Sequence, residues 1–597
     1  MILNIALAGL SPTLASATDT IAPTEPGAIT ASSLTGTSIA LKWGSSTDAS
    51  GIEGYRVYRG PTAAADTALS LIATTDAVTS FSATQLYSGT GYKFGVVAID
   101  TSNNKSLMRT TTIMTSTSSD TTAPAAPSSA SVTFRVFSDS RIDVGWGASS
   151  STDVVGYHVI RDGSLVATVD LPGTPRYSDN GLLPGTSHSY SIEAVDSAGN
   201  LSTGSPAKTI KTLAAGTVIL ARGPYLSNVT GTSGVVSWWT NVPTTGTVTI
   251  AGGSVNDPAG PTQHHVVTVS GLSPGTSYPY TVASASVTGG GTLRTAAAPG
   301  QTFSFAAISD FGGGSGGETQ NANNINGAGT QFIQTMGDDV YPSSGLPDPN
   351  FTTTYSDFDQ RFFKPFGAAV KSQAFFPTNG NKEYYGDGEF WAAFPMLGSN
   401  HSWYSYDWGD AHLLCLDSEQ SFAPTSDQYL FAQADLAAHQ SAAWRIVAIQ
   451  RPPYSSTTAN SSSKPVRTDL VPLFQQEKVD LVLSGNSHNY ERTFPLVDGV
   501  ATSGGVTYVV SGAGGNGFNA FTGTAPAYSA FRESSYYEYA KVTVSPTAVT
   551  VDAVRADSNT VFDTTTITKT GATNTMPPSP STGLAVGQPT AATVPSS

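Results

Sequence analysis

Residues 337–341 read Gly-Asp-Asp-Val-Tyr and directly follow the predicted strand Phe332–Met336. Other polar loops of the C-terminal half also lie near the ends of predicted strands. These strands alternate with helical stretches such as Gln428–Gln440. The loops are Ser309-Asp310-Phe311-Gly312, Gly380-Asn381-Lys382-Glu383, Gln450-Arg451-Pro452-Pro453-Tyr454-Ser455-Ser456 and Ser484-Gly485-Asn486-Ser487-His488-Asn489-Tyr490-Glu491-Arg492. This order predicts an α/β layered domain with its chemistry on loops at the carboxyl ends of strands.

The order and spacing of these loops resemble the calcineurin-like metallophosphoesterases, specifically the purple acid phosphatases. That family reads Asp-x-Gly, Gly-Asp-x-x-Tyr, Gly-Asn-His-Glu, His-x-Pro and Gly-His-x-His. A single Gly-Asp pair is common in turns, but here the whole series follows in order over about 300–550. The resemblance implies a metallophosphoesterase α/β sandwich over 300–570. We expect Glu491 and Arg492 to form a structural ion pair.

The resemblance also implies a two-metal site in which a bridging carboxylate joins the ions. The first ion would take four residues that are all present: Asp310, the bridging Asp338, Tyr341 and His488. A phenolate, carboxylates and one imidazole suit ferric iron.

The second metal set departs from the family pattern. It would consist of Asp338, Asn381 and histidines at two positions that here hold Gln450 and Asn486. The catalytic histidine of the family is replaced by Lys382. Replacement imidazoles are scarce, because residues 301–570 contain only His401, His412, His439 and His488.

These substitutions predict one metal ion, for which iron is one candidate and calcium, magnesium, zinc and manganese stay open. Amide oxygens at Gln450 and Asn486 are weaker ligands for a transition metal than imidazole, although they suit hard cations. Lys382 places an ammonium where it can attract phosphate as a point charge. Lys382 and Asp338 are therefore the catalytic candidates. Two interpretations remain open: a retired or strongly altered site, and a working hydrolase with an unusual metal centre.

An internal repeat marks the N-terminal part. Trp43 and the strand Tyr55–Arg59 recur about 100 residues later as Trp146 and Tyr157–Arg161. Both copies follow an Ala-Pro junction and show short alternating strands, which resemble fibronectin type III domains. We therefore predict such β-sandwiches over 20–118 and 120–213, with both tryptophans in their cores. A third segment, 217–297, resembles the β-sandwich that precedes the catalytic domain in purple acid phosphatases.

Composition limits the partners of this chain. Its formal charge is −15, so phosphate backbones are repelled and nucleic-acid binding is not expected. Charged residues make up 12%, about half the usual ~25%, as suits an exported β-rich protein. The one cysteine, Cys415, permits no intramolecular disulfide, and no apolar run is long enough for a transmembrane helix.

The two ends suggest export. Residues 1–17 resemble a signal peptide or form an N-terminal arm, and 571–597 form an uncharged tail rich in Pro, Thr and Ser. We expect a secreted or cell-surface protein. Two functions from different classes remain: a weak or specialised phosphomonoesterase acting on phosphate esters, and a non-catalytic extracellular scaffold. The scaffold would bind cell-surface, glycan or self-association partners through its β-sandwiches.

Overall fold

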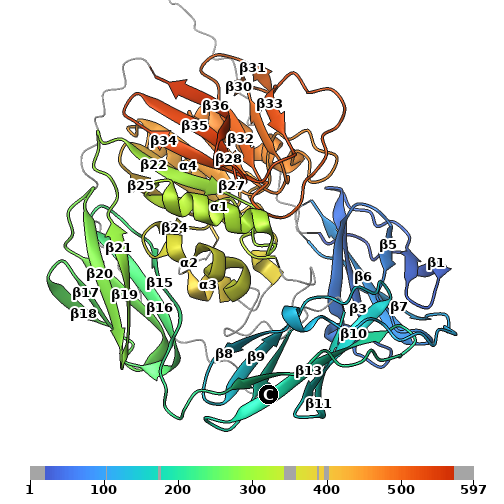
Figure 1. Ribbon diagram of the computed structural model, residues 1–597. Coiled ribbons are helices and arrows are strands. Elements are labelled where there is room, and N and C mark those ends of the chain that lie inside the picture. The colour runs from blue at the N-terminus through green and yellow to red at the C-terminus, as the bar shows by residue number, and fades with distance from the viewer. Residues whose placement is uncertain are drawn as a thin grey trace, which may run out of the picture.

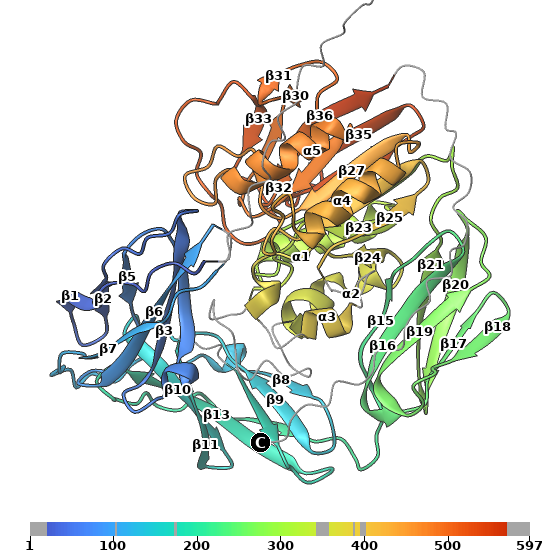
Figure 2. The same ribbon diagram turned by 180° about the vertical axis from the view of Figure 1, so that it is seen from behind.

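The computed structural model describes residues 21–101, 104–171, 176–341, 358–385, 389–394 and 402–569. The expected signal peptide or arm and the whole expected tail, 571–597, lie outside these residues. Seen from both sides, the β-sandwiches form an arc, and its first member returns to the C-terminal domain (Figures 1 and 2). No helix of the described part is both long and apolar enough for a membrane span.

The first two sandwiches have the same plan, a three-stranded sheet facing a four-stranded one. The first contains the sheets β1-β2-β5 and β4-β3-β6-β7, and the second contains β12-β9-β8 and β11-β10-β13-β14. Their strands are β1 (Thr30–Leu34), β2 (Ile39–Lys42), β3 (Ile52–Pro61), β4 (Ser70–Asp76), β5 (Ser80–Ala83), β6 (Gly91–Asp100), β7 (Arg109–Met114), β8 (Thr133–Val136), β9 (Arg141–Gly145), β10 (Val154–Arg161), β11 (Ser164–Asp170), β12 (Arg176–Asn180), β13 (Ser187–Asp196) and β14 (Lys208–Lys211). Trp43 and Trp146 lie in the respective cores, as predicted.

The third sandwich shares a sheet with the C-terminal domain. One of its sheets has the order β18-β17-β20-β21, and the other, β19-β16-β15, continues into a nine-stranded sheet. The junction is a parallel pairing of Ser227 with Phe375. The strands are β15 (Leu220–Ser227), β16 (Ser233–Thr244), β17 (Thr247–Ile250), β18 (Gly253–Asn256), β19 (Thr262–Ser270), β20 (Ser277–Ser284) and β21 (Val287–Arg294).

The C-terminal domain has two sheets between layers of helices. The rest of the nine-stranded sheet is β24-β23-β22-β34-β35-β36, and the second sheet is β25-β26-β27-β28-β32-β29-β33. The strands are β22 (Phe303–Ile308), β23 (Phe332–Thr335), β24 (Ala374–Phe376), β25 (Tyr404–Trp408), β26 (Ala411–Leu416), β27 (Trp444–Ile449), β28 (Leu481–Ser484), β29 (Tyr490–Thr493), the small pair β30 (Leu496–Val497) and β31 (Val500–Ala501), β32 (Thr507–Ser511), β33 (Ser529–Glu533), β34 (Glu538–Val544), β35 (Ala548–Arg555) and β36 (Val561–Thr568). The helices are α1 (Gly316–Gly327), α2 (Lys364–Val370), α3 (Glu389–Ala393), α4 (Asp427–Ala438) and α5 (Val471–Gln476).

Three cores hold these layers together. The central core fills the space between the sheets and includes Phe305, Phe332 and Trp444. Separate cores contain α1 and α2 residues and α4 and α5 residues, respectively. The predicted class, β-sandwiches followed by an α/β metallophosphoesterase sandwich, is confirmed. The mixed sheets place the carboxyl ends of β22, β23, β24, β27 and β28 beside one another, because neighbouring strands among them run parallel.

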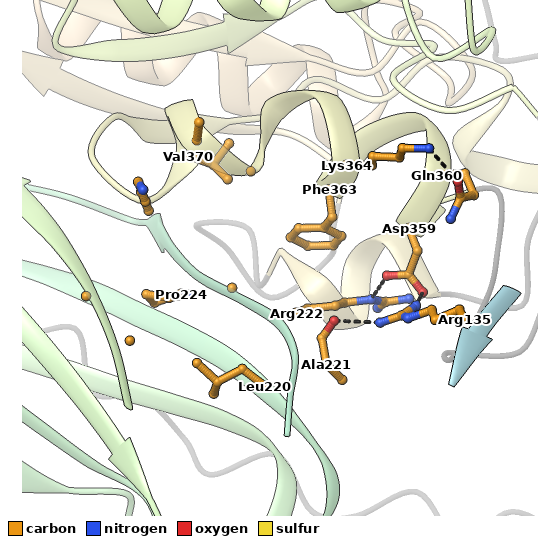
Figure 3. Close-up of a pocket in the computed structure, with 16 residues that line it drawn as sticks. Arg135, Leu220, Ala221, Arg222, Pro224, Asp359, Gln360, Phe363, Lys364 and Val370 are labelled. Atoms are coloured by element: carbon orange, nitrogen blue, oxygen red, sulfur yellow. Dashed lines mark hydrogen bonds and ion pairs between the residues drawn. The ribbon is translucent and has the colours of Figure 1, made fainter. Parts of the chain in front are cut away.

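One carboxylate joins three domains. Asp359, in a π-helical turn (Asp359–Phe363) before α2, pairs with Arg222 of the third sandwich and, at 2.8 Å, with Arg135 of the second (Figure 3). The junction borders a cavity of about 590 Å³. No predicted metal ligand lines this cavity, so it is separate from the site described next.

Candidate metal centre

Backbone contacts bring the predicted loops together. Gly337 has a φ of +86°, and a Cβ there would lie only 2.6 Å from the Cα of Gly380. A Cβ on Gly380 would in turn lie 2.4 Å from Oδ1 of Asp338. Side chains at these two glycines would therefore separate the loops that carry Asp338 and Asn381.

Three predicted site residues adopt an unusual backbone conformation. Asp310 and Asp338 each have a φ of +55°, and Asn486 has a φ of +62°. Aspartate, asparagine and histidine tolerate this left-handed region better than most residues do. Such strain gathers at functional sites, where the surrounding structure enforces it.

Three of the four predicted ligands of the first metal touch one another. The Tyr341 hydroxyl donates to Oδ1 of Asp310 at 2.8 Å and lies 3.2 Å from Nε2 of His488. Nε2 of His488 lies 3.4 Å from the same Asp310 oxygen. The other Asp310 oxygen accepts from the backbone N–H of Asn486 at 2.7 Å. A phenol, a carboxylate and an imidazole thus face a common point, with buried Asp338 as their electrostatic neighbour.

The surroundings raise the pKa values of Tyr341, Asp338 and His488, so these side chains hold their protons more tightly. Burial raises the pKa of Tyr341 well above its ordinary value, and the nearby carboxylates of Asp310 and Asp338 add to the rise. Burial raises the pKa of Asp338 to about 6, the Lys382 ammonium opposes the rise, and Asp310 adds to it. Burial alone would lower the pKa of His488, but the contact with Asp310 outweighs it and raises that pKa. A bound cation would therefore replace protons here.

Glu383 supports the loops, a role that the sequence interpretation missed. Its carboxylate accepts from the backbone N–H groups of Asp338 at 3.0 Å, Asp339 at 2.8 Å and Gly380 at 2.7 Å. These bonds orient the loops that carry Asp338 and Asn381. The signal was the Gly-Asn-x-Glu spacing, in which a buried glutamate follows the ligand loop.

Lys382 and Gln450 surround Asn381, which would be a ligand of the second metal. In one orientation of its amide, Asn381 donates to both Asp338 oxygens, at 3.1 and 3.2 Å, and accepts from Nζ of Lys382 at 2.8 Å. In the other orientation, its oxygen accepts from Nε2 of Gln450 at 3.1 Å. The backbone N–H of Asn381 donates to Oε1 of Gln450 at 3.2 Å. Gln450 is fully buried, whereas Asn486 is half-buried.

The fold implies two metal ions, and the residues at only one of the two positions fit a metal ion. Asp310, Tyr341 and His488, with Asp338 beside them, fit one ion, because carboxylate, phenolate and imidazole are all metal ligands. The second set does not fit a divalent transition-metal ion, because amides replace both imidazoles and the Lys382 ammonium lies beside Asn381. The site therefore offers one metal position and one fixed organic cation.

The expected ion pair between Glu491 and Arg492 is wrong. Arg492 pairs with Asp563 at 2.7 Å, whereas the Glu491 carboxylate accepts from the backbone and hydroxyl of Ser456. Consecutive residues on β29 point to opposite faces of the sheet, so they cannot pair.

The first sandwich reaches the edge of the site. Arg451, next to Gln450, pairs with Glu419 at 2.6 Å and with Glu53 on β3 at 3.3 Å. Because Glu53 belongs to the first sandwich, a domain about 400 residues away in sequence contacts the loop after β27. No motif or repeat in the sequence indicates this contact.

Known proteins match separate parts of the chain. A family model described as iron/zinc purple acid phosphatase-like protein C matches residues 505–564, and the fibronectin type III model matches 24–112. Exoglucanase B of Cellulomonas fimi is 36% identical over 209 residues, which is 34% of this chain and 18% of that protein. Probable inactive purple acid phosphatase 1 of Arabidopsis thaliana is 31% identical over 185 residues, 28% of this chain and 30% of that protein. The chain thus spans less than a third of either relative.

A solved structure shares the fold over most of the chain. Purple acid phosphatase PPD1 from seeds of yellow lupin (Lupinus luteus) superposes with a TM-score of 0.55 at 18% identity, covering 72% of this chain and 93% of that one. This fold implies an iron/zinc type of metal centre. The chain thus resembles the purple acid phosphatases in the fold and sequence of its C-terminal part and carries a fibronectin type III match at its N-terminal end, while its metal-site motifs depart in part from the family pattern.

Proposed function

We propose that this chain is a secreted phosphate-ester-binding protein that holds one metal ion and hydrolyses phosphate monoesters slowly or not at all. The observation that carries the proposal is the position of the Lys382 ammonium, which lies 2.8 Å from the Asn381 oxygen when that amide donates to Asp338, at the side chain that would bind a second metal. The small share of charged residues, 12%, and the Pro/Thr/Ser-rich segment 571–597 support secretion.

Each group of the site would have a distinct role in phosphate binding. A metal ion held by Asp310, Asp338, Tyr341 and His488 would polarise a phosphoryl oxygen. The Lys382 ammonium attracts a second phosphoryl oxygen as a point charge. Asn381 accepts from that ammonium when its own amide donates to Asp338. Asp338 accepts from the Lys382 backbone N–H and attracts the ammonium electrostatically. In-line displacement also needs an activated oxygen nucleophile, and no second ion is placed to supply one. The site thus favours binding over turnover.

Phosphate binding and aryl phosphate hydrolysis test this proposal together. Wild type should bind inorganic phosphate in calorimetry, and Lys382→Met should weaken binding at least about tenfold because the fixed cation is lost. Lys42→Met, a change on an exposed strand position of the first sandwich, is the matched control and should bind like wild type. Equal binding by Lys382→Met and Lys42→Met would contradict the assigned role of Lys382.

The contact between Glu53 and Arg451 favours a second candidate, the non-catalytic scaffold. A β-sandwich that rests on a loop of the site uses this surface for domain packing. The similarity to an exoglucanase supports a polysaccharide as one partner. The scaffold predicts that Asp338→Asn/His488→Ala leaves polysaccharide binding and self-association unchanged, as measured by sedimentation. Loss of either property in this variant would tie it to the metal site.

A further inference from the structure

A second cluster of metal-binding side chains lies at the edge of the second sheet, formed by Asp407, His412 and His439. One potential ligand atom from each lies within 4.8 Å of the others. Asp407 and His412 are cross-strand partners in the β25–β26 hairpin, and His439 follows α4 as its C-terminal cap. Nδ1 of His412 lies 2.8 Å from Oδ1 of Asp407, and the two imidazole rings stack with centroids 3.7 Å apart.

A fourth residue, Asp435, lies within hydrogen-bond distance of one nitrogen in each imidazole ring. Its carboxylate lies 2.7 Å from Nε2 of His412, and its backbone carbonyl lies 2.7 Å from Nδ1 of His439. The Ser405 hydroxyl donates to the remaining Asp435 oxygen at 2.8 Å. Histidines that bind metals typically donate their other N–H to a carboxylate or a backbone carbonyl. The nitrogens not bonded to Asp435 are Nδ1 of His412, which contacts Asp407, and Nε2 of His439, and these two could face an ion shared with Asp407.

We propose that Asp407, His412 and His439 bind a divalent transition metal, with Zn²⁺ as the favoured ion. The ion would replace the proton shared by His412 and Asp407, which is released, and the two side chains would move apart from their 2.8 Å contact to admit metal–ligand bonds of about 2.0–2.2 Å. Two imidazoles and one carboxylate suit Zn²⁺, Ni²⁺ or Cu²⁺ and not Ca²⁺ or Mg²⁺. The rings are nearly parallel, at 8°, so His439 must turn to direct its nitrogen at the ion.

The exposure of the cluster allows this adjustment. The His439 and Asp407 side chains are each 30% exposed, whereas His412 is 1% exposed. Water can therefore complete the coordination while the buried ring stays fixed. The ion would join the edge strand β25, through its hairpin, to the end of α4. This site uses none of the residues of the candidate metal centre and does not depend on the proposed function.

Calorimetric titration of metal-stripped full-length protein tests the proposal. The background is Asp338→Asn/His488→Ala, which removes two ligands of the candidate metal centre. We expect about one equivalent of Zn²⁺ or Ni²⁺ and no Ca²⁺ to bind. Asp407→Asn and His439→Ala change exposed residues and spare the buried His412, and each should lower Zn²⁺ affinity at least about tenfold.

The chain offers a matched control. His188 pairs with Asp162 at 2.8 Å in the second sandwich, without a second imidazole in the described contacts, so His188→Ala should bind Zn²⁺ like the background. Zn²⁺ should also raise the unfolding temperature of the background and of His188→Ala, but not that of Asp407→Asn. Absence of Zn²⁺ binding, or equal affinities in Asp407→Asn, His439→Ala and His188→Ala, would show that the cluster is an ion-pair network alone.

Discussion

Lys382 and Asn381, neighbours in sequence, bond through their side chains: Nζ of Lys382 lies 2.8 Å from the Asn381 oxygen when the amide donates to Asp338. The family places a metal ion beside this asparagine. Here an ammonium takes the oxygen, and the same Lys382 donates its backbone N–H to Asp338 at 3.0 Å. Lysine at position 382 thus supplies a fixed positive charge where the family has a metal ion. This charge can attract phosphate, but it cannot generate a metal-bound hydroxide.

Metal analysis should find at most one tightly held ion in the candidate metal centre. If ferric iron is bound, the Tyr341 phenolate should give a visible charge-transfer band, and Tyr341→Phe should abolish it. The control is Tyr404→Phe, because the buried Tyr404 hydroxyl donates instead to the backbone oxygen of Pro377 at 2.7 Å. Two equivalents of transition metal retained by Asp407→Asn/His439→Ala would contradict the one-ion site.

The two tryptophans of the repeat should each contribute strongly to the unfolding free energy of their sandwich. Trp43 and Trp146 are 5% and 6% exposed and pack edge-on against Tyr55 and Tyr157. Replacing either with alanine should cost about 3–5 kcal/mol of unfolding free energy, measured by denaturant titration. Variants that melt like wild type but lose glycan binding would instead identify a carbohydrate platform.

The sequence predicted the loops of the site because each is a local motif. The repeat of Trp43 and Tyr55 at Trp146 and Tyr157 likewise predicted both sandwiches. Contacts between distant segments left no such signal: Arg492 binds Asp563 and Arg451 binds Glu53, pairings set by the packing of strands and domains. The cluster around His412 was missed because its ligands come from a hairpin and a helix end.

Cys415 should resist thiol reagents in the folded protein. It is fully buried, and burial raises the pKa of its thiol to about 11. Only about one thiol in a thousand would be ionised at pH 8, and the thiolate is the reactive form. Titration with an aromatic disulfide reagent should give no rapid reaction in native protein and one equivalent in denaturant. Rapid native labelling would mean that this strand opens readily.

Metal-free protein should lose stability between about pH 5 and pH 8 through Glu538. Burial raises the pKa of this carboxyl to about 8, although Ser511 donates to it. An unfolded glutamate titrates near 4.3, so the folded state binds more protons in this window and stability falls as pH rises. Glu538→Gln should reduce, but not remove, the dependence of the urea midpoint on pH, because burial also raises the pKa values of Glu318 and Glu383 to about 8. Asp557→Asn removes a surface carboxyl whose pKa the bond to Arg555 lowers, so it should keep the wild-type slope in this window.

The unmodified protein should hydrolyse simple phosphate monoesters poorly, and restoring three histidines should improve it. Lys382→His removes the ammonium from Asn381, and Gln450→His and Asn486→His supply imidazoles. Position 486 has a φ of +62°, which histidine tolerates better than most residues, so the loop should persist. The triple variant, assayed with an aryl phosphate and added iron, zinc or manganese, should gain metal and turnover, because two ions can then activate the nucleophile and neutralise the phosphoryl group. Asp338→Asn in the triple variant should remove the gain. Robust turnover by the unmodified protein that is lost on Asp338→Asn would instead make the altered site a working one.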